Sequence, residues 1–474
     1  MGENSVKPSQ LLKKKFPFRP TGGQGRFFDQ MDDFLIEEPG LERYRDCFLL
    51  KGYAGTGKTT LISTLIKVVG EFGYKTVLLA PTGRAAKVMS NYSKKIALTI
   101  HKKIYKVSSD SGGHLVFDLQ PNYNENTLYI VDEASMISDE SDFGSRSLLS
   151  DLIDYIFDKP GNKLILIGDT AQLPPVGKAS SPALDNLYLQ KHYFMSVFEE
   201  ELTEVMRQEE HSGILKNATS LRDVLRNQSA SIQIQTHQFK DIYRMTGEKL
   251  EEGLRYAYDK YGDENTILIT RSNKVAVQYN EYIRRTIHFC EEEIDAGDRL
   301  MVVRNNYTIL DDESPISFIA NGDFVELLKI KRTEERYGFR FADVILRFTD
   351  YDNMPEFDAK IFLDTLHSAS PNMSVADNKK LYEAVSEDYQ HLKTKKQKLD
   401  AIRKDPFLNA LQVKFAYALT CHKSQGGQWS AVFIDQGYLP EDQINEDFIR
   451  WLYTAMTRST EEVFLMNFYP KFFQ

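Results

Sequence analysis

The segment GYAGTGKTT, Gly52–Thr60, constrains this chain more than any other part of its sequence. It fits the pattern G-x-x-x-x-G-K-[ST] between an apolar run and a helical pattern, so a strand–loop–helix unit is expected. The glycines let backbone N–H groups curl around phosphate, and the following helix adds its dipole. A chance match is expected in roughly one or two per hundred chains of this length at average composition. We predict that ATP is bound by Gly52, Tyr53, Ala54, Gly55, Thr56, Gly57, Lys58, Thr59 and Thr60.

Within this loop, two side chains have distinct expected roles. Lys58 can reach the β- and γ-phosphates, and Thr59 can hold Mg²⁺. The predicted cofactors are therefore ATP and Mg²⁺.

Apolar runs and helical stretches alternate from Asp46 to about Asn217, and a second series begins at Thr266. Several runs are continuously apolar, which is typical of parallel strands buried on both faces. We therefore predict an α/β fold with two units in tandem, each a sheet covered by helices. The expected strands are Cys47–Leu50, Lys75–Ala80, Thr127–Val131, Lys163–Gly168 and Glu201–Val205, then Thr266–Thr270, Val413–Leu419, Ala431–Asp435 and Val463–Phe468.

Two stretches interrupt this alternation. Residues 105–126 are polar and turn-rich around a short apolar centre, which favours an inserted β-hairpin. Residues 318–409 contain runs typical of short antiparallel strands, followed by a charged, helix-prone segment. We predict a first domain at 1–217, a second at 218–317 and 410–474, and an inserted domain at 318–409.

Size and composition favour packed domains rather than disorder. With 474 residues, 42% of them hydrophobic, the chain is expected to form about two to four domains. With a net charge of −9, the chain lacks the overall basic character of many nucleic-acid-binding proteins. A locally basic groove can nevertheless coexist with an acidic exterior. Three scattered cysteines argue against disulfides and zinc, and no apolar run is long enough to span a membrane. A cytoplasmic protein is expected.

Adjacent carboxylates, Asp132 and Glu133, follow the apolar run Thr127–Val131. We predict that Asp132 binds Mg²⁺, directly or through water, and that Glu133 polarises the attacking water. Two solvated acids at a strand end are the alternative, and for such a pair alone that alternative is favoured. The phosphate-binding loop upstream favours the catalytic interpretation.

A second polar pair, Asp169 and Gln172, follows the run Lys163–Gly168. Parallel strands present their carboxyl ends at one edge of a sheet, so this pair is expected beside the nucleotide. The amide of Gln172 can sense the γ-phosphate. A proline-rich turn is the alternative, and it explains Pro174 and Pro175 but not the polar pair before them.

Eight motifs occur in order along nearly the whole chain, and their series resembles that of the superfamily 1 helicases. They are the phosphate-binding loop, Ala80–Lys87, Thr99–Lys102, VDEASM, GDTAQLPPVG, Leu202–Gln208, Tyr417–Trp429 and Leu452–Ser459. Within this superfamily the chain is similar to the RecD-like branch that includes the phage Dda helicase. The resemblance implies two RecA-like P-loop domains in tandem, a pin-type hairpin in the first, and an SH3-like plus helical insertion in the second. The resemblance does not include the N-terminal extensions of RecD-type proteins, so partners that dock on such extensions are not expected.

The resemblance also implies roles for three residues at the ATP site. Gln24 matches the glutamine that reads adenine, although an ordinary polar residue at a helix start is the alternative. Arg207 and Arg458 match the two arginines that close on the γ-phosphate and neutralise transition-state charge. For either arginine alone, a surface salt bridge is the default interpretation. Because Arg458 belongs to the second unit, ATP is expected in the cleft between the units.

The resemblance further implies a track for single-stranded DNA across both units. Hydroxyl, histidine and basic side chains suit phosphate contacts, which position a strand without reading its sequence. For His101 alone, a structural histidine is the alternative. The expected contacts are Pro81, Thr82, Arg84, Lys87, Thr99, His101 and Lys102, with Thr420, His422, Lys423, Ser424 and Gln425 on the second unit.

Phe117 is the apolar residue expected at the tip of the inserted hairpin. The resemblance implies that an aromatic residue there separates the two strands of a duplex. Packing of Phe117 into a small core of the hairpin is an equally weighted alternative.

The resulting interpretation is an ATP-dependent DNA helicase that moves 5′→3′ on single strands, with single-stranded DNA and junctions as partners and a monomeric motor. The polarity rests on the resemblance alone. One alternative is a translocase that displaces bound proteins and unwinds little. Another is a P-loop kinase of small metabolites, against which a second α/β unit argues. RNA as the substrate stays open, because backbone contacts seldom exclude it.

Overall fold

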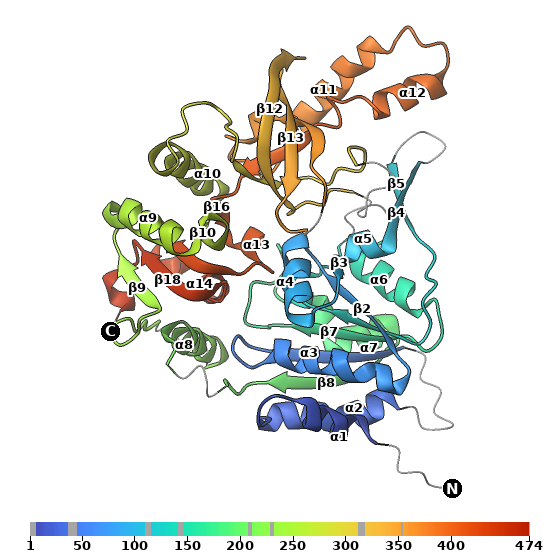
Figure 1. Ribbon diagram of the computed structural model, residues 1–474, viewed down its shortest axis with the longest axis vertical. Helices are drawn as coiled ribbons and strands as arrows, with labels where there is room; N and C mark the ends of the chain where they lie inside the picture. The colour runs from blue at the N-terminus through green and yellow to red at the C-terminus, as the bar shows by residue number, and fades with distance from the viewer. Residues whose placement is uncertain are drawn as a thin grey trace.

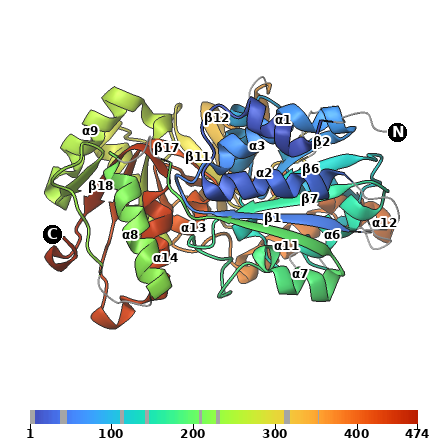
Figure 2. The same ribbon diagram turned by 90° about the horizontal axis from the view of Figure 1, so that it is seen from below.

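The computed structural model describes residues 6–36, 45–109, 115–140, 146–206, 211–227, 232–310, 318–351 and 354–473, with the side chains of 107–109 and 115–117 left out. Two parallel sheets form the lower part of the molecule in Figure 1, and a β-barrel with two helices lies above them. Seen from below in Figure 2, the two sheets and their helices lie next to each other.

The first sheet has six parallel strands in the order β3-β2-β6-β7-β1-β8. Along β1, Phe48 and Leu50 pack into a core with α2 and α3, whereas Cys47 and Leu49 pack into a core with α6 on the opposite face. Burial on both faces explains why these strands are continuously apolar. The strands are β1 Asp46–Gly52, β2 Lys75–Ala80, β3 Ala97–Thr99, β6 Thr127–Val131, β7 Lys163–Gly168 and β8 Ser196–Leu202; the helices are α1 Pro8–Lys15, α2 Gly22–Leu35, α3 Lys58–Val68, α4 Gly83–Ser93, α5 Ile100–Ile104, α6 Leu148–Phe157 and α7 Asn186–Tyr193.

The second sheet has five parallel strands in the order β16-β10-β17-β18-β9. Helix α8 packs against α14, so the second unit already includes Gly213, earlier than the predicted boundary after residue 217. The strands are β9 Ile242–Met245, β10 Thr266–Thr270, β16 Ala418–Thr420, β17 Trp429–Asp435 and β18 Ser459–Met466; the helices are α8 Gly213–Asn227, α9 Leu250–Tyr261, α10 Asn273–Tyr282, α13 Cys421–Ser424 and α14 Glu446–Met456.

The two parallel sheets confirm the predicted α/β class, but two strand predictions were wrong. The strand expected at Glu201–Val205 lies at Ser196–Leu202, an edge strand. It contains three consecutive glutamates, of which Glu199 is partly exposed, Glu200 buried and Glu201 exposed, so it lacks a continuous apolar run. The run Val413–Leu419 is divided between two sheets. Val413 pairs with Val302 of the barrel, whereas Ala418 pairs with Leu268 of the second sheet.

Between β3 and β6 the chain forms a two-stranded antiparallel sheet, β4 Tyr105–Ser109 and β5 Leu115–Leu119. It projects from the first unit toward the barrel's helices in Figure 1. Phe117 lies in β5 opposite Val107, and its side chain lies outside the described part of the structure.

The barrel is closed by five strands and spans 299–415, more than the predicted insertion at 318–409. Helices α11 Val375–Asp388 and α12 Lys395–Arg403 follow its fourth strand, and Leu381 and Val385 of α11 pack against Phe341 of the barrel. The barrel strands are β11 Arg299–Val302, β12 Phe324–Arg336, β13 Phe339–Phe348, β14 Phe357–Phe362 and β15 Leu411–Phe415. Across the described residues, no helix has the length and apolar character needed to cross a membrane.

Candidate active site

The carboxyl ends of β1, β6 and β7 meet at one edge of the first sheet, because these strands are parallel neighbours. A cleft of about 400 Å³ opens there, and part of its wall comes from the second unit. Its lining includes these predicted residues: Tyr53, Ala54, Gly55, Gly57, Lys58, Thr59, Thr60, Asp132, Glu133, Gln172 and Arg458. Residues far apart in the sequence therefore share one cavity.

The phosphate-binding loop depends on glycine at Gly57. Its φ of 82° is left-handed, and a Cβ there would lie 2.7 Å from Nε2 of Gln24. Lys58 begins α3, and its Nζ donates to the carbonyl oxygens of Gly52 at 2.6 Å and Tyr53 at 2.9 Å. The buried Thr56 hydroxyl also donates to Tyr53 O, at 2.8 Å. The loop is thus pre-shaped, and the lysine lies across it.

Gln24 is buried behind this loop rather than in the lining of the cleft. Its Oε1 accepts from Thr21 N at 3.1 Å in a capping box at the start of α2. Its Nε2 donates to Thr56 O at 3.0 Å. In this structure the amide therefore ties α2 to the loop, and the adenine contact stays a prediction.

Glu133 lies across the cleft from the second unit's arginine. Arg458 is buried, and its Nη1 lies 3.7 Å from Glu133 Oε1. Glu133 adopts left-handed backbone (φ 53°), a sparsely populated conformation often found at functional sites. Burial raises the pKa of the Glu133 carboxyl, and the charge of Arg458 partly opposes this rise. A carboxylate with a raised pKa accepts a proton more readily near neutral pH.

Tyr453 of α14 lies behind the lining of the cleft and contacts two residues of that lining, and the sequence interpretation missed it. Its hydroxyl donates to Asp169 Oδ2 at 2.5 Å and accepts from Ala54 N of the phosphate-binding loop at 3.0 Å. Burial raises the pKa of the phenol well above its usual range, and Asp169 adds to this rise. The motif LYTAMTRS contains Tyr453, but a tyrosine in an apolar helix is typical of a core residue, so the sequence pattern does not single it out.

Gln172 contributes a buried polar atom to the cleft. In the described part of the chain, its Oε1 has no hydrogen-bond partner. Buried amide oxygens are rarely left unsatisfied, so this atom is available to a bound water or ligand. Nearby, Leu173 N donates to Thr454 Oγ1 at 2.9 Å and Leu173 O accepts from Gln425 Nε2 at 2.7 Å. The loop after β7 is thereby joined to the second unit.

Thr59 and Asp132 both line the cleft and together fit a magnesium site. Mg²⁺ prefers oxygen ligands and usually keeps several waters or phosphate oxygens, so one hydroxyl and one carboxylate are sufficient protein ligands. Asp132 is held by Tyr92, whose hydroxyl donates to Oδ2 at 2.9 Å. No cluster of three or more His, Cys, Asp or Glu side chains suited to a metal occurs within the described ranges. The predicted Arg207 lies outside those ranges.

The basic side chains predicted to contact DNA on the first unit face the barrel. Lys102 Nζ lies 3.3 Å from Asp323 Oδ2 and donates to the hydroxyl of Tyr351 at 2.6 Å. Arg84 Nη1 donates to Asp350 Oδ1 at 2.9 Å. Lys102, Asp323 and Asp350 are buried, so these pairs form a bridge that holds the barrel on α4 and α5.

The remaining predicted residues of the first unit differ in accessibility. Thr82 and Thr99 cap α4 and α5 through their hydroxyls, and Lys87 Nζ donates to Thr349 O. Pro81 and Thr82 are partly exposed beside these caps. Burial lowers the pKa of His101 to about 4, so its imidazole is neutral at pH 7.

The predicted residues of the second unit surround α13. Ser424 and Gln425 are buried and bonded within the protein, whereas Thr420 is partly exposed and His422 is exposed. Lys423 Nζ is buried and has no hydrogen-bond partner in the described ranges. Burial lowers the pKa of Lys423 to about 8. A phosphate beside this ammonium group would stabilise its charged form.

Family models match both units of the chain. A model described as an AAA domain matches residues 41–234, and one described as a UvrD-like helicase C-terminal domain matches residues 415–466. The two matched ranges contain every residue predicted for the ATP site except Gln24.

Similar proteins include two from viruses. The chain is 26% identical to protein R530 of Acanthamoeba polyphaga mimivirus over 88% of this chain and 95% of that protein. It is 26% identical to the ATP-dependent DNA helicase dda of Enterobacteria phage T4 over 64% of this chain and 67% of that helicase. Among solved structures, the Pif1 helicase from Bacteroides with ADP-AlF3 and single-stranded DNA is 17% identical, with a TM-score of 0.45 and coverage of 96% and 94% of the two chains.

Proposed function

The chain belongs to the superfamily 1 helicases of the RecD/Pif1/Dda type, and we propose that it couples Mg·ATP hydrolysis to 5′→3′ movement along single-stranded DNA and to duplex unwinding. The observation that carries this proposal is the shared cleft. Lys58, Glu133 and Gln172 of the first unit line the same cavity as Arg458 of the second. An ATPase built across two units can convert hydrolysis into relative movement.

In the proposed reaction each side chain has a separate task. Glu133 orients the attacking water and takes its proton, and its raised pKa suits that role. Lys58 and Arg458 neutralise charge on the transferring phosphoryl group, and Arg207 is proposed to join them. Gln172 Oε1, which has no hydrogen-bond partner among the described residues, accepts from the water, or the amide reports the γ-phosphate. Thr59 and Asp132 hold Mg²⁺, which supplies further charge neutralisation.

We propose that Tyr453 and Arg458 transmit to the second unit whether the γ-phosphate is present in the ATP site. Tyr453 already contacts both the phosphate-binding loop and Asp169. When the γ-phosphate is lost, Arg458 loses its partner and the cleft opens. Because one chain supplies both sides of the cleft, we propose a monomeric motor.

The single strand is proposed to run over Pro81 and Thr82 on the first unit and over Thr420, His422 and Lys423 on the second. The buried bridges of Arg84 and Lys102 would act indirectly, by fixing the barrel beside that track. These contacts are mainly to phosphate and sugar, so binding is expected to tolerate any base sequence.

We further propose that the hairpin β4–β5 acts as the pin and the barrel as the SH3-like domain of this helicase type. Phe117 would be the residue of the pin that separates strands at a junction. A Phe117→Ala variant that retains full unwinding per ATP hydrolysed would assign strand separation to another part of the protein.

Matched duplexes with either a 5′ or a 3′ single-stranded tail test the proposal directly. We expect ATP-dependent unwinding of the 5′-tailed duplex only. Unwinding of the 3′-tailed duplex only would contradict the polarity. ATPase activity that single strands stimulate without unwinding would favour a protein-displacing translocase, and ATPase activity indifferent to DNA would contradict both.

A further inference from the structure

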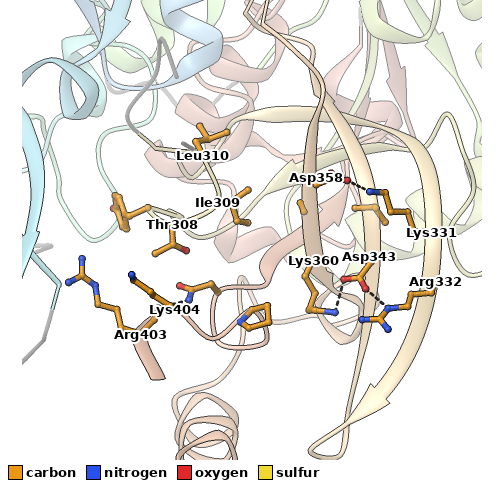
Figure 3. Close-up of a pocket in the computed structure, with 15 residues that line it drawn as sticks. Thr308, Ile309, Leu310, Lys331, Arg332, Asp343, Asp358, Lys360, Arg403 and Lys404 are labelled. Atoms are coloured by element: carbon orange, nitrogen blue, oxygen red, sulfur yellow. Dashed lines mark hydrogen bonds and ion pairs between the residues drawn. The ribbon is translucent and has the colours of Figure 1, made fainter. Parts of the chain in front are cut away.

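A large hollow lies on the barrel, away from the ATP cleft. Its volume is about 990 Å³, at the upper end of the roughly 300–1,000 Å³ typical of small-ligand pockets. Strands β12, β13 and β14 form one wall, and residues 307–310, the last residue of α12 and the segment after it form the rest. In Figure 3 Arg403 and Lys404 lie on one side of this hollow, across from Lys360, Asp343 and Arg332 of the barrel.

The lining of this hollow is basic, although the whole chain is acidic. Five cationic side chains, Lys331, Arg332, Lys360, Arg403 and Lys404, line it against two carboxylates, Asp343 and Asp358. The chain as a whole carries a net charge of −9. Positive charge gathered in a hollow on an acidic protein focuses the field toward an anionic ligand.

The barrel's own cations are already neutralised. Lys331 pairs with Asp358, and Arg332 pairs with Asp343. Lys360 lies 2.6 Å from Asp343 and 2.6 Å from Glu334. These pairs fix the barrel wall, and they leave the surplus charge on the opposite side of the hollow.

That surplus comes from Arg403 and Lys404 at the end of α12. Within the described part of the chain, neither side chain forms an ion pair. Cations at a helix C-terminus stabilise the helix dipole, and this ordinary role accounts for one basic residue in the last turn. It does not explain why both residues line a hollow that is walled by three further cations. In Figure 1 the hairpin β4–β5 points toward α11 and α12, so this side of the barrel lies on the hairpin's side of the molecule.

We infer that this hollow, with Arg403 and Lys404 as its contacting groups, binds the sugar-phosphate backbone of nucleic acid at the junction. The inference rests on the proposed function, because it places a second nucleic-acid contact beyond the single-strand track. Two parts of a junction share this chemistry: the displaced strand and the duplex ahead of the hairpin. Phosphate groups suit a hollow with unpaired cations, and the contacts require no base sequence.

Direct binding without ATP tests the inference separately from motor activity. The variant Arg403→Glu/Lys404→Glu is compared with Lys395→Glu/Lys396→Glu, which makes the same charge change at exposed positions of α12 outside the hollow. The probes are a plain single strand, a 5′-tailed duplex and a fork with both tails. Fluorescence anisotropy gives each affinity as a function of salt, and thermal melting checks the fold. Lys404→Glu alone, at an exposed position, is the second variant.

For the double variant we expect about tenfold weaker fork binding at low salt and a salt slope smaller by about one to two, as for two lost phosphate contacts. The control variant should bind the fork as tightly as the wild type does. The double variant should keep its affinity for the plain single strand. If affinity falls only for the fork, the hollow binds the displaced strand. If affinity falls for both the fork and the 5′-tailed duplex, the hollow binds the duplex backbone. Either result supports the inference. Fork binding equal to that of the control overturns it. Poly-glutamate serves as a fourth probe: if the double variant loses poly-glutamate binding while its fork affinity is unchanged, the hollow binds an acidic peptide and the inference is overturned. A wild-type ATPase that single strands fail to stimulate would contradict the proposed function instead.

Discussion

The hydroxyl of Tyr453 donates a hydrogen bond to Asp169 at 2.5 Å, although Asp169 follows β7 of the first unit and Tyr453 lies in α14 of the second. The same hydroxyl accepts from Ala54 N in the phosphate-binding loop. One buried side chain therefore joins the loop, the end of β7 and helix α14. This link connects the phosphate-binding loop directly to the second unit, and it can be tested without changing Lys58 or Glu133.

Tyr453→Phe should lower the turnover rate of the single-strand-stimulated ATPase by about tenfold, because a hydrogen bond to a charged group contributes roughly 1.5–3 kcal/mol. Steady-state kinetics at saturating DNA would measure the effect. Tyr438→Phe, at an exposed tyrosine of the same unit, is the matched control. Turnover equal to that of the control would mean that the hydrogen bond does not transmit the state of the site.

Glu133→Gln should retain ATP binding but lower hydrolysis by about 10²- to 10⁴-fold, because the amide cannot accept the proton of the attacking water. Equilibrium binding of a fluorescent ATP analogue and phosphate release separate the two steps. Lys58→Ala should lose both. Near-normal phosphate release by Glu133→Gln would assign the base to another residue.

The acid side of the pH–rate profile should depend on Arg458. Burial raises the pKa of Glu133 and Arg458 lowers it, so the carboxylate protonates as the pH falls through a value above that of an ordinary glutamate. Removing the arginine's charge in Arg458→Met should raise this pKa further and move the acid limb of kcat to higher pH. The readout is the pH at the midpoint of this acid limb, because the maximal kcat falls in any variant that lacks Arg458. An unmoved limb would show that Glu133 is not the titrating group.

Lys102→Met should destabilise the protein by about 3–5 kcal/mol, because it leaves the carboxylate of Asp323 buried without its cation. The double variant Lys102→Met/Asp323→Asn should recover much of that loss, since no buried charge remains. Denaturant unfolding followed by fluorescence would give both values. Destabilisation that is equal in the single and double variants would contradict an ion-pair origin.

DNA binding should take up protons near pH 8 through Lys423. Its lowered pKa of about 8 leaves it partly neutral there, and a neighbouring phosphate would favour the protonated form. Calorimetry in buffers of different ionisation enthalpy should therefore show proton uptake, with binding that weakens from pH 7 to pH 9. Lys423→Arg should abolish this pH dependence because arginine stays charged. Equal proton uptake by the wild type and by Lys423→Arg would show that another group takes up the proton.

Local pattern was sufficient to bring together the first unit's residues of the cleft and to place four of the parallel strands. The runs predicted at Lys75–Ala80, Thr127–Val131, Lys163–Gly168 and Thr266–Thr270 coincide with β2, β6, β7 and β10. Strands buried on both faces must be continuously apolar, and their carboxyl ends meet at one edge. Those two facts place Lys58, Asp132, Glu133 and Gln172 together without knowledge of any distant contact.

Only the tertiary structure decided which partners the other side chains have. Val413 and Ala418 belong to one apolar run, but their strand partners, Val302 and Leu268, lie more than a hundred residues away. Lys102 looks like a phosphate ligand in the sequence, yet it lies 3.3 Å from Asp323 of the barrel. The reason is physical: backbone periodicity is set by near neighbours in the chain, whereas the partner of a buried charge or a strand edge is set by the packing of whole domains.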